Sequence, residues 1–375
     1  MEHNSSTHPL LPPTTEDQKV DWLRLLRSRR VGVSTFYRLM RDHGTAKEAL
    51  HHLPDIALAA GVQSYEVCPE AVVQAELKAA KSVGAQLVCH GDVHYPSDLK
   101  DLDDAPPMLW AIGAPDILCK PQIALVGARN ASSLGGRMAR ALAAELGQAG
   151  YVITSGMARG VDTAAHLAAL GTGTIAVLGG GVDVLYPAEN TRLAEDIVAN
   201  GGVRISEQPM GLQPQARHFP ARNRIISGLA RAVVVVEAAA KSGSLITART
   251  ALDQGREVMA VPGHPFDARA SGCNMLLRDG ARLIRSAADV VEALAPLAEP
   301  EPELPLDRAD HQRPLAETAQ LHQKILDRLG PSPLGEDQLI RDLGASSRAV
   351  SPALTDLELE GRISREPGGL IALRA

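Results

Sequence analysis

Between residues 83 and 294, short and almost wholly apolar runs alternate with stretches of helical patterning. Ile123–Val126 and Ala232–Val236 are two of these runs. Consecutive apolar residues predict strands that are buried on both faces, as in parallel sheets covered by helices. The alternation predicts an α/β fold with an extended Rossmann-like, doubly wound and mostly parallel sheet. Gln86–Cys89 and Met108–Ile112 predict two further strands that extend this sheet.

The predicted sheet domain covers residues 83–295, and the chain on either side of it has a different character. Amphipathic patterns around a glycine-containing turn predict an N-terminal helical module of the SAM or helix-hairpin-helix type over 17–82. Proline and acidic residues predict a linker over 296–315. Beyond it, 316–375 has the helix-turn-helix and hairpin pattern of a winged helix. We expect the polar residues 1–16 to form a disordered tail.

The amino-acid composition indicates in which compartment the protein is expected. Hydrophobic residues make up 45% of the chain and charged residues 22%, as in a soluble globular protein. No apolar run reaches the ~20 residues of a membrane span, and the N-terminus lacks the apolar core of a signal peptide. We therefore expect a reduced, cytoplasmic protein with no membrane contact and no structural metal. Its four cysteines stand in no CxxC or metal-ligand spacing: Cys68, Cys89, Cys119 and Cys273.

Charge is distributed unevenly. The chain carries a net charge of −6, but Lys120–Leu294 contains 18 Lys and Arg against 14 Asp and Glu. Nearly all of these cations are arginine, the side chain suited to bidentate phosphate contacts. Only 3% of the residues are aromatic, so an aromatic side chain beside a basic loop is a candidate for stacking.

Glycine-rich, polar loops follow the predicted strands. In an open α/β sheet, ligands bind beyond the carboxyl ends of the strands. Glycines let a backbone approach a phosphate closely, and amides at helix N-termini hold it. Five such loops in succession predict a site for phosphate or for a polyphosphate backbone. The candidate binding residues in these loops are Gly127, Arg129, Ser132, Ser155, Gly156, Arg159, Gly160, Gly179, Gly181, Lys241, Ser242, Gly243, Ser244 and Thr247.

The most distinctive stretch is Phe219–Gly228, just before a buried strand. Two arginines, Arg222 and Arg224, flank Asn223, which we expect to cap a helix. The three residues together predict an anion site. Phe219 is expected either to stack on a nucleobase or to pack in the core.

The motifs of nucleotide enzymes are missing. There is no GxGxxG after the first strand of the parallel set, no acid after the second, and no GxxxxGK[ST] anywhere. Asp162 and His166 lie four residues apart on one helix face, with no positioned nucleophile. We interpret Asp162, His166 and Asp183 as structural or orienting residues, one of the acids balancing an arginine. We expect no catalytic residue, no metal and no cofactor.

Six motifs in this order resemble the DprA/Smf family (DNA-processing protein A). They are Gly127–Arg129, Ser155–Asp162 with His166, Gly179–Asp183 with Tyr186-Pro187, Phe219–Ile226, Ser242–Ala248 and Val261–Gly263.

The resemblance implies a protein that binds single-stranded DNA without catalysis. Family members load the recombinase RecA onto incoming strands in natural transformation, displace single-strand-binding protein and dimerise through the Rossmann-like domain. The family's DNA pocket would fall on Arg129, on the Arg222-Asn223-Arg224 segment and on the loop of Lys241. Many relatives carry a basic residue after Tyr-Pro, where this chain has Ala188 and then Glu189, so one backbone contact is lost or replaced by Lys241.

Two other functions stay open. Related folds include nucleotide phosphoribohydrolases, although the Ser242–Ala248 loop lacks the glutamate of their PGGxGTxxE motif. A transcriptional regulator acting through the winged helix is the other, although its presumed recognition helix carries Asp356, Glu358 and Glu360.

Overall fold

A computed structural model describes residues 12–298, 315–330, 332–366 and 368–374, and the chain divides into two compact units at about residue 299. Most of the expected N-terminal tail and of the expected linker lies outside the described residues. Inside the expected tail, Thr15 caps the first helix through a capping box with Gln18. The last helix of the first unit continues to Ala298, three residues into the expected linker. No helix in the described ranges has the length and apolar character needed to span a membrane.

Four helices form the N-terminal module: α1 (Glu16–Arg27), α2 (Val33–His43), α3 (Ala46–Ala59) and α4 (Glu70–Ser82). Trp22 of α1 packs edge-on against Phe36 of α2, with 5.1 Å between the ring centroids. The module is joined to the sheet by Glu76 of α4, whose carboxylate accepts hydrogen bonds from Trp110 and from Arg27. The predicted helical module is confirmed.

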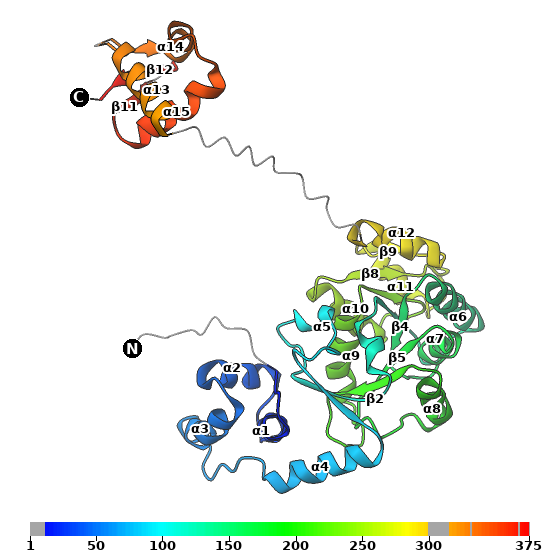
Figure 1. The fold of residues 1–375 in the computed structure, drawn as a ribbon. Coiled ribbons are helices and arrows are strands. Elements are labelled where there is room, and N and C mark those ends of the chain that lie inside the picture. The colour runs from blue at the N-terminus through cyan, green and yellow to red at the C-terminus, as the bar shows by residue number, and fades with distance from the viewer. Residues whose placement is uncertain (1–11, 299–314, 331, 367, 375) are drawn as a thin grey trace. The chain divides into compact units, whose positions relative to one another are not determined.

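A nine-stranded sheet follows, with the order β1-β2-β6-β5-β4-β3-β7-β8-β9 (Figure 1). Its strands are β1 (Gln86–Cys89), β2 (Met108–Gly113), β3 (Gln122–Val126), β4 (Val152–Ser155), β5 (Thr174–Val177), β6 (Val203–Ser206), β7 (Ala232–Val235), β8 (Glu257–Ala260) and β9 (Arg282–Leu283). The pairs from β6 to β9 are parallel, whereas β1 and β2 add two antiparallel pairs at one edge. The predicted mostly parallel sheet and its two added strands are confirmed.

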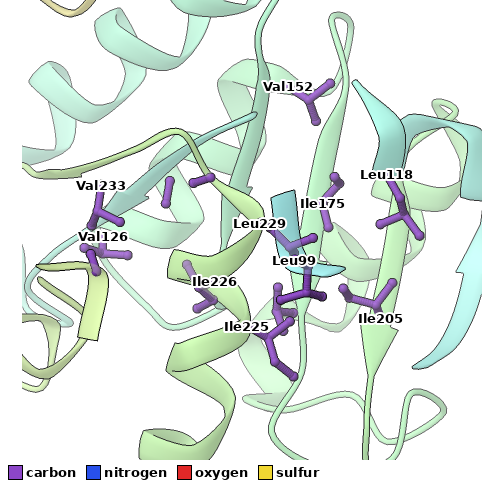
Figure 2. Packing of buried hydrophobic residues seen from close by; sticks show 14 of the residues in the cluster. Leu99, Leu118, Val126, Val152, Ile175, Ile205, Ile225, Ile226, Leu229 and Val233 are labelled. Carbon is purple, nitrogen blue, oxygen red and sulfur yellow. The ribbon is translucent and has the colours of Figure 1, made fainter. Parts of the chain in front are cut away.

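Helices cover both faces of this sheet (Figure 1). They are α5 (Ser97–Lys100), α6 (Ser133–Gln148), α7 (Val161–Ala169), α8 (Thr191–Ala199), α9 (His218–Leu229), α10 (Ser244–Asp253), α11 (Ser271–Arg278) and α12 (Ala287–Ala298). On one face, Ile225, Ile226 and Leu229 of α9 pack on strand residues such as Val126 and Val233 (Figure 2). On the other face, α6, α7 and α12 cover the sheet. Burial of apolar side chains on both faces explains why the strands read as continuous apolar runs.

The prediction of a helix cap at Asn223 is wrong. Helix α9 begins five residues earlier, at His218 with Arg217 as its N-cap residue, so Asn223 lies in the middle of the helix. Pro220 occupies the first turn, where its fixed φ suits a helix and its missing N–H needs no partner.

The second unit is a winged helix, as predicted. It contains α13 (Leu315–Arg328), β10 (Leu334–Gly335), α14 (Glu336–Leu343), α15 (Ser347–Leu359), β11 (Ile363–Glu366) and β12 (Leu370–Leu373). The strands form one sheet in the order β10-β12-β11. Gly368 and Gly369, both with positive φ, stand at the tip of the β11–β12 hairpin.

Candidate nucleic-acid interface

Arg222 is buried under the carboxyl ends of the central strands. Its Nη1 donates to the carbonyl of Gly156 at 2.7 Å and also to that of Val177, which ties α9 to the ends of β4 and β5. Burial lowers the pKa of the guanidinium to about 10, against the opposing effect of the Asp162 carboxylate. Arg222 therefore organises the floor of the candidate site.

Arg224 also has intramolecular partners. Its guanidinium forms an ion pair with Glu207 and donates to the carbonyl of Asp104 at 2.5 Å. The side chains of Arg224 and Glu207 are only 14% and 15% exposed, so this pair is largely withdrawn from solvent. Burial raises the pKa of Glu207, while the charge of Arg224 opposes that shift. Asn223 lies between Arg222 and Arg224 and is half-buried. Its side chain has no hydrogen bond to another described residue.

An exposed cluster of aromatic and cationic side chains lies above this floor. The Arg129 guanidinium lies 5.5 Å from the centre of the Phe219 ring, and the ring centroids of Tyr186 and Phe219 are 5.8 Å apart. Arg129 is exposed, Phe219 is half-buried, and Tyr186 is 52% exposed. We call Arg129, Tyr186 and Phe219 the aromatic–arginine cluster. A planar base can stack here while its phosphate meets a cation.

Tyr186 was missed as a site residue by the sequence analysis. It belongs to a Tyr-Pro motif that was recognised, but nothing in a single sequence shows that this ring meets Phe219 from a segment 33 residues away. The available signal was weak: an aromatic residue in a polar strand-end loop of a chain with few aromatics.

The backbone of the β4–α7 loop hydrogen-bonds to the carboxylate of Asp162, in the first turn of α7. The Oδ2 atom of Asp162 accepts hydrogen bonds from the backbone N–H groups of Gly156 at 3.1 Å and Ala158 at 3.2 Å. Burial raises the pKa of Asp162 to about 6. The Asp183 carboxylate similarly accepts from the N–H of Gly211 at 2.8 Å. The backbone amide of Gly156, a candidate for phosphate binding, thus hydrogen-bonds to an internal carboxylate.

Several candidate glycines are needed for internal packing. A Cβ atom on Gly156 would lie 2.6 Å from Nη1 of Arg222, and one on Gly179 would lie 3.2 Å from the Phe219 ring. Gly160 has a φ of +80°, and a Cβ there would meet the carbonyl oxygen of Ala128 at 2.2 Å. The other two candidates with close internal neighbours are Gly127 and Gly181.

His166 is buried and held by a hydroxyl. The Thr174 hydroxyl donates to the carbonyl of Ile153, so it accepts a hydrogen bond from Nδ1–H of His166 at 2.7 Å. Burial lowers the pKa of the imidazole to about 3, which keeps it neutral. Ser155, at the end of β4, is likewise buried, and its hydroxyl donates to the carbonyl of Leu125. In the structure, Asp162 and His166 thus both hydrogen-bond to other groups of the protein.

The loop before α10 is the most open of the candidate phosphate loops. Lys241 and Gly243 are exposed, and the hydroxyls of Ser242 and Ser244 lie 2.7 Å apart. Within the described ranges, no carboxylate hydrogen-bonds to residues 241–244. Thr247, one turn into α10, is buried.

Of the candidate cations in the described part of the chain, three are exposed: Arg129, Arg159 and Lys241. Arg159 lies 3.7 Å from Glu189, and both side chains are more than 60% exposed, so this pair is weak. Neither Arg129 nor Lys241 forms an ion pair with another residue that the structure describes. These cations and the aromatic–arginine cluster can hold an anion that carries flat groups. The described residues contain no group of three or more His, Cys, Asp or Glu able to bind a metal ion.

The fold and site define an extended Rossmann-like protein with a helical module before the sheet, a winged helix after it, and a cationic, aromatic site at the strand ends. Three family models match in the same order: a DprA-like N-terminal HHH domain over 16–79, DNA recombination-mediator protein A over 86–295, and a DprA winged helix domain over 309–369. The chain belongs to the DprA/Smf family.

Similar proteins give the same assignment. Protein Smf of Escherichia coli is 34% identical over 94% of this chain and 95% of its own length. The DNA processing protein DprA of Streptococcus pneumoniae is 47% identical over 52% of this chain and 70% of its own.

Two solved structures are also similar. DprA of S. pneumoniae matches with a TM-score of 0.54 at 35% identity and covers 70% of this chain and 98% of that one. DprA of Helicobacter pylori, described for its single-stranded DNA binding mode, matches with a TM-score of 0.51 at 30% identity over 56% of this chain and 96% of that one.

Proposed function

We propose that this protein binds single-stranded DNA at the carboxyl ends of strands β3, β4, β5 and β7 and acts as a recombination mediator without catalysis of its own. The carrying observation is the aromatic–arginine cluster, in which an exposed arginine and two rings from separate segments meet above a buried, hydrogen-bonded floor. The single-stranded DNA binding of the H. pylori relative supports this proposal.

In this proposal the candidate residues have two roles. Arg129, Phe219, Lys241, Ser242 and Gly243 contact DNA, and Tyr186 joins them. Arg222, Arg224, Asp162, His166 and Asp183 hold the loops in place through internal hydrogen bonds and ion pairs. This division follows from exposure, because only the first group can reach a ligand without breaking an internal contact.

Binding is tested by fluorescence anisotropy with a labelled dT oligomer and with a duplex of equal length. We expect tighter binding of the single strand, weakened by Arg129→Ala. Arg140→Ala, which removes an exposed arginine from the second turn of α6, is the matched control and should bind like the wild type. Equal binding by all three proteins would refute the assignment of the site.

Loading of RecA onto single strands is the finer part of the proposal. It predicts that the protein accelerates RecA filament formation on DNA already coated with single-strand-binding protein, and that Arg129→Ala loses this acceleration.

A homodimer through the Rossmann-like domain is also proposed. The exposed edge strand β9, with both Arg282 and Leu283 accessible, supports that interface. Sedimentation of the full chain over a range of concentrations tests it.

A further inference from the structure

The sheet has a topological switch point between β3 and β7. These neighbours are parallel, with Val126 opposite Val235. From β3 the chain continues to β4, β5 and β6 on one side, and from β7 it continues to β8 and β9 on the other. In Rossmann-like folds the crevice at this point takes a nucleotide, with its phosphate at the N-terminus of the helix that follows the first strand. Here that helix is α6.

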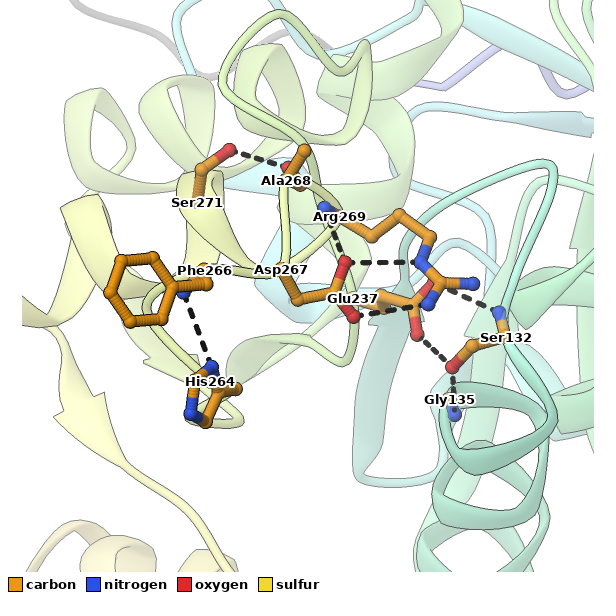
Figure 3. Close-up of polar contacts among 9 residues, drawn as sticks. All are labelled: Ser132, Gly135, Glu237, His264, Phe266, Asp267, Ala268, Arg269 and Ser271. Carbon is orange, nitrogen blue, oxygen red and sulfur yellow. Dashed lines mark hydrogen bonds and ion pairs between the residues drawn. The ribbon is translucent and has the colours of Figure 1, made fainter.

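A glutamate of this chain fills that position. Glu237 comes shortly after β7 and is 8% exposed. Its Oε1 accepts a hydrogen bond from the backbone N–H of Ser132 at 2.9 Å, and its Oε2 accepts one from the Ser132 hydroxyl (Figure 3). Ser132 is the N-cap residue of α6, and its Oγ accepts from the N–H of Gly135 at 2.9 Å. The Glu237 carboxylate therefore lies at the N-terminus of α6.

The surrounding backbone is fitted to this carboxylate. A Cβ atom on Gly135 would lie 2.4 Å from Oε2 of Glu237, so the carboxylate packs where a side chain at position 135 would begin. The Glu237 carbonyl accepts a hydrogen bond from the N–H of Ala128 at 2.6 Å, which holds the β3–α6 loop around the same residue. Arg269, from the loop after β8, lies near enough to feel the charge of Glu237, but its guanidinium pairs with Asp267 at 3.1 Å (Figure 3). A bound phosphate would need the donors that Glu237 uses, the backbone N–H and the hydroxyl of Ser132 at the start of α6. A nucleotide therefore does not fit this crevice while Glu237 is present.

We propose that Glu237 is a built-in substitute for a nucleotide phosphate, which closes the Rossmann crevice to free nucleotides. A DNA strand would then bind only to the exposed cations and aromatic rings around the carboxyl ends of the strands. This inference goes beyond the proposed function, because it concerns which ligands the fold excludes. It also explains how a Rossmann-like sheet can bind a nucleic acid strand without competition from free nucleotides at the crevice.

The alternative is that Glu237 only stabilises the N-terminus of α6. Both roles predict a loss of stability on truncation, because a buried N–H and a hydroxyl lose their acceptor. Only exclusion predicts a gain of anion binding, because the vacated space keeps the two donors of Ser132. The experiment therefore measures a gain.

Glu237→Ala, Glu237→Gln and wild type are compared by thermal unfolding in increasing concentrations of inorganic phosphate and of AMP. For Glu237→Ala we expect both probes to raise the Tm, by roughly 2–3 °C at ten times the Kd. The wild type should show a smaller rise, set only by its exposed cations and rings. Adding Ser132→Ala to Glu237→Ala should return the response to the wild-type level. Glu189→Gln removes an exposed acid from the same edge of the sheet and is the matched control.

A folded Glu237→Ala protein without a phosphate response, or a wild type with the same response, overturns the proposal. Glu237→Gln keeps the size of the side chain but removes the charge that repels phosphate, so its response must exceed that of Glu189→Gln. Equality of those two variants overturns the proposal even where Glu237→Ala does not fold. Binding of dT oligomers by the same proteins is measured separately, so failure of the DNA-binding proposal is distinguishable from failure of this one.

Discussion

The guanidinium of Arg222 hydrogen-bonds to the carbonyl oxygen of Gly156, a residue 66 positions earlier in the chain, at 2.7 Å. This contact gives the Arg-Asn-Arg segment a structural role in the fold. The sequence marks both arginines as anion ligands, whereas the fold uses them to fix α9 against the strand ends. The exposed Arg129 is left as the cation closest to the Phe219 ring.

Arg222→Ala should destabilise the protein as well as weaken DNA binding. Two buried carbonyls would lose their donor and the buried Asp162 would lose a nearby positive charge, at a cost of about 2–5 kcal/mol in the free energy of unfolding. Urea denaturation measures this cost. Arg129→Ala, whose side chain is exposed, should weaken binding with an unchanged urea midpoint. An Arg222→Ala protein with wild-type stability and no DNA binding would show that Arg222 contacts the ligand itself.

Arg129→Ala should also change the salt dependence of binding. A cation that neutralises one phosphate of a single strand contributes about 0.7 to the slope of log K against log[salt]. We expect the slope to become shallower by about that amount, measured by anisotropy with dT oligomers at four or more salt concentrations. A weaker affinity with an unchanged slope would mean that Arg129 contacts bases or positions Phe219 without meeting a phosphate.

Tyr186→Ala should weaken single-strand binding by about 1–3 kcal/mol, the range measured for loss of base stacking. Tyr186→Phe keeps the ring and should bind like the wild type, which separates stacking from any role of the hydroxyl. Titration of the same dT oligomer gives both values. Equal losses for the two variants would point to the hydroxyl.

Ala188→Lys should tighten binding, since it adds a positive charge at an exposed position two residues after Tyr186 and next to the acidic Glu189. The expected change is a several-fold gain in affinity at low salt, with a steeper salt slope. Ala199→Lys adds the same charge at the far, exposed end of α8 and serves as the control. Equal gains in the two variants would indicate a general effect of net charge.

His166→Gln should change how stability depends on pH. The folded protein keeps His166 neutral down to about pH 3, whereas the unfolded chain protonates it near 6.5. Its contribution is therefore present above pH 6.5 and lost as the pH falls. Asp162 has the opposite sign, because its pKa is raised from 3.8 to about 6 and the folded state takes up the proton first.

In the wild type these two contributions largely cancel between about pH 6 and 4. His166→Gln keeps only that of Asp162, so its stability relative to the wild type should rise by up to about 1.4 kcal/mol per pH unit as the pH falls. Urea denaturation at several pH values tests this difference. Parallel curves for the two proteins would contradict a buried, neutral His166.

Much of the fold follows from local patterns. The strand predicted at Gln86–Cys89 coincides with β1, and the apolar run Ile123–Val126 lies within β3, because such a run is decided within a few residues. Asn223 shows the limit of that reasoning. Its side chain suits a cap, but α9 already begins at His218, where Pro220 fits the first turn and Arg222 is held by the carbonyl of Gly156.

The amino-acid sequence by itself determined the class of sheet, the order of the domains and the motifs of the family, because these depend on periodicity and on residue types at fixed spacing. Only the tertiary structure decided which polar groups remain available to a ligand. Ser132 and Glu237 are 105 residues apart, and Arg222 and Gly156 are 66 apart. Such partners meet only when the strands pair, and a hydrogen bond made inside the protein removes that donor from the site.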